Sequence, residues 1–100
     1  MSDNNNQIEN KPQERKIEFK DFIASLYMSA VVSLGLIPDP ITNEKRKNIS
    51  FAQETIEILR ILKEKTRGNL TEEESKFLDD CTYKLMLQFV DAIKEGDKKA

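Results

Sequence analysis

Apolar residues recur along this chain at spacings of three and four, the period of one face of an α-helix, and show no strand-like alternation. The first such stripe comprises Phe19, Ile23, Leu26, Ala30 and Leu34. It predicts a helix over residues 18–34. Gly35 suits the left-handed position after a helix, and Pro38 follows where a helix no longer continues. Because apolar residues also cover the other sides of this helix, we expect it to be buried all round.

The second stripe predicts a helix over residues 51–66. Ser50 with Gln53 matches a capping box, in which each side chain binds a backbone N–H at the start of the helix. The side that we expect to be buried comprises Ala52, Ile56, Ile58, Leu59, Ile61 and Leu62. A polar stripe runs from Gln53 to Glu64, so this helix is predicted to have one side in water.

The third stripe predicts a helix over residues 72–94, opened by a second capping box of Thr71 with Glu74 and followed by Gly96. Nearly every position after the start of this helix is apolar outside one narrow polar stripe. One side comprises Leu78, Cys81, Leu85, Met86, Phe89, Ala92 and Ile93, and the residues flanking it are Tyr83, Leu87 and Val90. Like the first helix, this helix is apolar over more than half of its circumference.

These elements predict an all-α fold, a single three-helix domain over residues 18–95. Residues 1–17 are rich in Asn, Gln and charge, which is typical of a disordered polar tail. Residues 96–100 are expected to be a frayed C-terminus. A chain of 100 residues supports one domain at most and has a thin core.

The first and third helices carry more apolar surface than a three-helix monomer covers, because each helix in such a bundle keeps one side in water. Soluble monomers seldom expose a large contiguous apolar patch. We therefore predict a homo-oligomer, most simply a two-fold dimer, or a complex with another protein. The predicted interface residues are Phe22, Tyr27, Val31, Tyr83, Leu87 and Val90.

The chain has no histidine, and Cys81 is its only cysteine, which removes much of the catalytic repertoire. One chain therefore provides no zinc site of the Cys/His type and no Ser–His or Cys–His pair. Glu72, Glu73 and Glu74 lie in a first helical turn, where they complement the helix dipole rather than converge on a metal ion. We expect no enzyme, no catalytic, cofactor-binding or metal-binding residues, and a buried Cys81.

The formal net charge of −2 gives the chain no general attraction to nucleic acid. Two basic groups stand out, comprising Lys45, Arg46 and Lys47 in a loop and Lys63, Lys65 and Arg67 at a helix end. The helix between them separates the two groups by ~25 Å within one chain. A nucleic-acid-associated module, with both groups combined by dimerisation, is an alternative function.

Another alternative function is a peripheral membrane contact through Phe22–Ile37, because residues Phe22 to Pro38 carry no charge. From Phe22 to Leu34 a helix would rise only ~20 Å, against a hydrocarbon thickness of ~30 Å. We expect a buried helix of a soluble protein and no integral membrane segment. Nothing in the cysteine content indicates an oxidising compartment, so the expected location is the cytoplasm.

Three segments carry a resemblance to a known family, namely Phe22 to Leu26, Leu34 to Pro40, and Lys63 to Glu74 with the sequence KEKTRGNLTEEE. In this order and spacing the chain resembles the small bacterial proteins of the family called domain of unknown function 1844, over about Phe19 to Val90. The resemblance implies a helical bacterial cytosolic protein and brings no activity or catalytic residues. With the apolar surplus, it favours a non-enzymatic interaction or scaffold protein.

Overall fold

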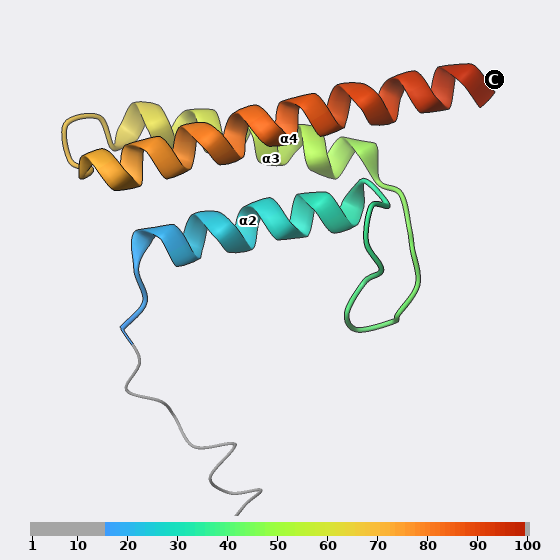
Figure 1. Cartoon of the computed structure of the whole chain (residues 1–100), viewed down its shortest axis with the longest axis horizontal. Helices are drawn as coiled ribbons and strands as arrows, with labels where there is room; N and C mark the ends of the chain where they lie inside the picture. Colours follow the sequence, from blue (N-terminus) through green and yellow to red (C-terminus); the bar gives the residue numbers. More distant parts are fainter. Residues whose placement is uncertain (1–15, 100) are drawn as a thin grey trace, which may run out of the picture.

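The computed structural model describes residues 16–99, with the side chains of residues 16–96, as three helices and their connections. The helices are α2 (Phe19–Ser33), α3 (Ile49–Lys65) and α4 (Glu72–Lys99). Figure 1 shows that α2 and α4 run in one direction and that α3 runs in the opposite direction. Each helix packs against the other two. The predicted all-α, three-helix fold is confirmed, while most of the predicted tail over residues 1–17 lies outside the described residues.

All three helices contribute to one core of buried side chains. Its members are Ile23, Ala30, Leu34, Ala52, Ile56, Leu59, Leu78, Cys81, Leu85 and Ala92. The buried polar residue Thr55 fits this core because its hydroxyl donates to the backbone oxygen of Phe51 at 3.0 Å. A buried hydroxyl with such a partner avoids the cost of an unmade hydrogen bond. The core therefore lies along the whole length over which the three helices overlap.

The predicted end of the first helix is confirmed in detail. After α2 the chain turns at Gly35, whose φ of 78° lies in the left-handed region that glycine adopts without strain. The start of the second helix was predicted wrongly. Asn48, not Ser50, is the N-cap of α3, and its Oδ1 accepts from the backbone N–H of Phe51 at 3.1 Å. Asn and Ser are similarly good caps, so two neighbouring candidates left the choice to the preceding loop.

The capping box of Thr71 and Glu74 opens α4 as predicted, because each side chain binds the backbone N–H of the other residue, at 3.1 and 2.9 Å. The predicted end of this helix near residue 94 was wrong. The helix continues through Gly96 to Lys99. A glycine inside a helix costs only about 1 kcal/mol relative to alanine, so it does not by itself stop a helix.

Two isoleucines of α3 were predicted to be buried and are not. Ile58 is 43% exposed and Ile61 is 56% exposed. The buried strip of α3 is narrow and consists of Ala52, Thr55, Ile56 and Leu59. Two residues beyond Leu59, Ile61 lies about 200° around the helix axis from it and hence faces away from the core. Apolar surplus is thus present on α3 as well as on α2 and α4.

Candidate interaction site

The most regular exposed apolar feature of the described chain lies on the side of α4 that faces away from the bundle. Tyr83, Leu87 and Val90, at spacings of four and three, are 64%, 49% and 45% exposed. Residues at this spacing lie on one stripe of a helix surface. The opposite side of the same helix is buried, with Leu78 and Leu85 at 1% and 0%. We call Tyr83, Leu87 and Val90 the α4 outer row.

Charged side chains of both signs border the α4 outer row. They are Lys76, Asp80, Lys84, Asp91 and Lys94, and all five are exposed. The row is therefore an apolar strip with acidic and basic groups along one flank and a lysine beyond each end. An apolar centre with a polar rim is the general anatomy of a protein–protein interface.

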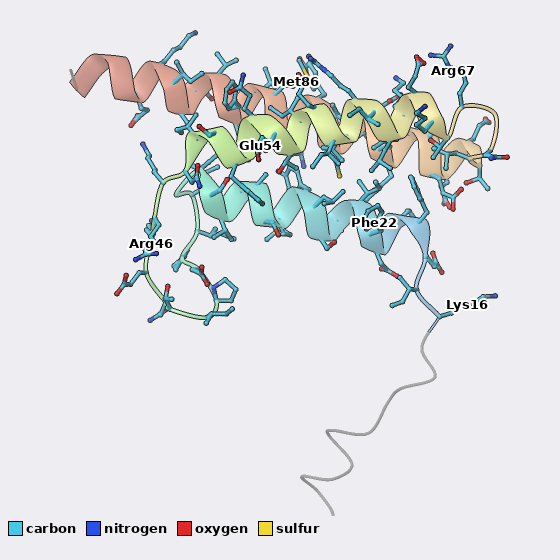
Figure 2. All side chains as sticks on the ribbon, turned by 180° about the vertical axis from the view of Figure 1, so that it is seen from behind. Lys16, Phe22, Arg46, Glu54, Arg67 and Met86 are labelled. Carbon is cyan, nitrogen blue, oxygen red and sulfur yellow. The ribbon has the colours of Figure 1, made fainter. Side chains whose placement is uncertain are left out.

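The α2 residues predicted for the same interface do not join this row. Val31 is buried, with 7% of its surface exposed. Tyr27 is half-buried, and its hydroxyl donates to Oε1 of Gln88 on α4 at 3.0 Å. Phe22 is 46% exposed near the start of α2 (Figure 2). Because α2 packs against both other helices, part of the surface that we assigned to an interface is covered within one chain. The helix is nevertheless not buried all round as expected, since Phe22 and Met28 are each 46% exposed.

A second apolar surface lies where α2 ends and the connection to α3 begins. It is a groove of about 630 Å³. The lining residues are Met28, Ser29, Val32, Ser33, Ile37, Pro38, Asp39, Pro40, Ile41, Arg46, Asn48 and Phe51. Sequence reasoning missed the groove, although Pro38 and Pro40 belong to the Leu34–Pro40 segment that carries the family resemblance. We call this surface the end groove.

Asp39 organises the loop that forms one wall of the end groove. Its backbone oxygen accepts from the N–H of Asn43 at 2.7 Å, and its own N–H donates to the oxygen of Glu44 at 2.9 Å. Its side chain accepts from the N–H of Ile41 at 2.7 Å, which makes an Asx turn. Ile41 at the tip is 90% exposed. One wall of the groove is thus held by the hydrogen bonds of Asp39, and the apolar side chain of Ile41 lies at its edge.

The two basic groups lie at opposite ends of the bundle. Figure 2 shows Arg46 on the loop before α3 and Arg67 beyond the other end of that helix. Two cations of the second group have acidic neighbours, since Lys63 Nζ lies 2.7 Å from Asp79 and an Arg67 nitrogen lies 2.6 Å from Glu64. Within one chain the basic residues therefore form no common surface for a phosphate backbone.

Cys81 lies among the core residues on the inner side of α4. Burial raises the pKa of its thiol, the nearby Lys84 lowers it to a smaller extent, and Asp80 raises it slightly. A buried thiol with a raised pKa has little thiolate at neutral pH and is a poor nucleophile. Cys81 therefore packs as a small apolar side chain, as the sequence predicted.

Residues 16–91 match the family described as Domain of unknown function (DUF1844), which covers most of the chain. No match was found among curated proteins or among solved structures. Among the described helices, none combines the length and the apolar character that crossing a membrane requires.

Proposed function

This chain belongs to the family described as Domain of unknown function (DUF1844), and we propose that it is a non-enzymatic interaction protein that pairs with a second copy of itself. In this proposal the α4 outer row forms the centre of the interface, and the protein acts in the bacterial cytoplasm. The observation that carries the proposal is the exposure of Tyr83, Leu87 and Val90 along one stripe of a helix whose other side is buried.

Burial of the row supplies the driving force for association. Transferring a large apolar side chain from water into an interface stabilises a complex by up to about 1.5–3 kcal/mol when it is fully exposed beforehand. The three side chains of the row are about half exposed, so each contributes a part of that amount. A row with spacings of four and three is also the pattern by which helices anchor in partner surfaces.

The small size of the domain favours a second copy of the chain as the partner that covers the α4 outer row. A domain of this length has a thin core, and self-association is a common way for small domains to gain stability. An interface made mainly by one helix from each copy is smaller than the ~1,600 Å² of a standard stable complex. We therefore expect a dimer that dissociates on dilution rather than a permanent one.

The residue types of the chain are consistent with a role without catalysis. Histidine is absent from the sequence, and the one cysteine is buried. The exposed carboxylates that border the row alternate with lysines along α4, as expected at the rim of an interface.

Light scattering after size exclusion, run across a dilution series, tests the proposal. The concentrated protein should have twice the mass of the 11.6 kDa chain and approach the single-chain mass on dilution. Leu87→Glu should give the single-chain mass throughout. Gln53→Glu is the matched control, because it adds the same charge at an exposed polar position of α3. A wild-type protein that has the single-chain mass at every concentration would refute the proposal.

A further inference from the structure

The charges beside the α4 outer row specify how two copies meet. We propose that α4 pairs with α4 of a second copy in antiparallel orientation, with the two-fold axis beside Leu87. This inference rests on the self-association proposed above and adds its orientation and register. The partner is thus a second copy of this chain, which binds through its α4 outer row and through the charges beside that row.

The register follows from two-fold symmetry. In an antiparallel pair of identical helices, positions equally far before and after the axis lie opposite each other. With Leu87 at the axis, its side chain meets the same residue of the second copy. Tyr83, four residues before Leu87, and Val90 of the second copy, three residues after it, are then opposite to within one residue, and their side chains pack together. The apolar row covers itself without leaving a member of the row unmatched.

The flanking charges match in the same register. Asp80 and Lys94 lie seven residues before and after Leu87, so each faces the other across the interface. Lys84 and Asp91 lie three before and four after Leu87 and are opposite to within one residue, which long charged side chains can span. All four side chains are exposed. Symmetry forms each of these contacts twice, so one register brings opposite charges together on both sides of the axis.

A parallel pair would lack these contacts. In a parallel two-fold pair one flank of a helix faces the opposite flank of its partner, so Lys84 and Asp91 would not meet across the interface. The attraction between opposite charges is therefore available only to the antiparallel pair.

Geometry also places three of the charges on one side of the row. At about 100° per residue, Asp80, Lys84 and Asp91 fall within roughly 40° of one another around α4, whereas Lys94 continues the line of the row beyond Val90. In an antiparallel two-fold pair, one flank of a helix faces the same flank of its partner. Lys84 and Asp91 are thus on the flank where an antiparallel partner presents them to each other, and Asp80 and Lys94 meet at the ends of the paired rows.

Neighbouring opposite charges on a helix also have an ordinary role within one chain. Asp80 precedes Lys84 by four residues, and Asp91 precedes Lys94 by three, which are spacings that support a helix by itself. The experiment must therefore separate contacts between chains from contacts within a chain. A charge swap between Lys84 and Asp91 does so, because these two residues are two helical turns apart and do not pair within a chain.

The experiment uses the full chain and the variants Lys84→Glu, Asp91→Lys and their combination, measured by sedimentation equilibrium. Each single variant creates two repulsive contacts in the antiparallel dimer, and we expect the dissociation constant to rise about tenfold. The combined variant should return to within about threefold of wild type. An equimolar mixture of the two single variants should also recover dimers, because each then meets an opposite charge. Circular dichroism checks that all variants remain helical.

The outcomes separate this inference from the proposed function. If wild type dimerises, Leu87→Glu abolishes the dimer, but the combined variant fails to recover, the register is wrong and the proposed function stands. In a parallel dimer Lys84 and Asp91 would not meet across the interface, so neither single variant would weaken association, and that result would also overturn the register. A wild type without self-association would refute both.

Discussion

Leu85 and Leu87 are the same residue on the same helix, two positions apart, and they have different surroundings. Leu85 is 0% exposed in the core, whereas Leu87 is 49% exposed on the outer side of α4. The difference shows that the apolar character of a residue does not determine its role, since the packing of other elements decides whether it is covered. The same contrast between a covered and an open position recurs at Gly35 and Gly68. It recurs again between the thiol of Cys81 and a thiol introduced at Val90.

The largest expected effect comes from truncating the two leucines. Leu85→Ala removes a fully buried side chain and should lower the free energy of unfolding by about 2–5 kcal/mol. Leu87→Ala should change it by no more than about 0.5 kcal/mol in the single chain, because the side chain is already half in water. Urea unfolding monitored by circular dichroism at low protein concentration measures both. Equal losses for the two variants would contradict the assignment of inner and outer sides.

Much of the fold could be predicted because its determinants are local. Helix-forming periodicity, the left-handed turn at Gly35, and the capping box of Thr71 and Glu74 act within a few residues. The capping rule alone did not identify the start of α3. There Asn48 and Ser50 both satisfy the pattern of a cap, and the position of the loop selects Asn48.

Which side chains are buried by other helices could not be predicted in the same way, because burial depends on contacts between helices that are far apart in sequence. Val31 and Ile61 show the two errors. Val31 was expected at the surface and is buried, while Ile61 was expected in the core and is 56% exposed. A helical wheel tells which residues share a side, but not which sides the neighbours cover. The three residues of the α4 outer row could be singled out because that side has no neighbour within the described chain.

The end groove was missed for a related reason. Its lining combines α2, the loop and the start of α3, and its shape depends on the hydrogen bonds of Asp39. A sequence pattern indicates a turn at Pro38–Pro40, but not the side of α2 against which that turn lies. The groove also has one acidic and one basic lining residue, Asp39 and Arg46, in contrast to the alternating charges along α4.

A smaller effect is expected at the two left-handed glycines. Gly35→Ala and Gly68→Ala both place a side chain at a positive φ, which costs about 1–2 kcal/mol. At Gly35 the new Cβ would also lie 3.0 Å from Cγ of Lys47, whereas at Gly68 no described atom beyond the two chain neighbours lies within 4 Å. Gly35→Ala should therefore destabilise the protein more than Gly68→Ala in urea unfolding. Lys47→Ala combined with Gly35→Ala should remove the extra loss, and an unchanged loss would show that the contact is irrelevant.

The smallest effect on stability concerns the covered thiol. Burial raises the pKa of Cys81 above its usual value, so the unfolded chain loses this proton at a lower pH than the folded chain. The contribution of the neutral thiol to stability is therefore fully present below the unfolded pKa and is lost as the pH rises from that value toward the folded pKa. Urea unfolding between about pH 7 and 10 should show an alkaline loss in wild type that is reduced in Cys81→Ala.

Alkylation compares this covered thiol with an open one. With iodoacetamide at neutral pH, native Cys81 should react at least about tenfold more slowly than the thiol of a Val90→Cys variant made in a Cys81→Ala background. In urea the two should react alike, because unfolding exposes both. At high protein concentration the variant thiol should become slower, since the proposed dimer covers the α4 outer row. A native Cys81 that reacts as fast as the outer thiol would mean that the inner side of α4 opens readily, because local opening exposes buried groups without global unfolding.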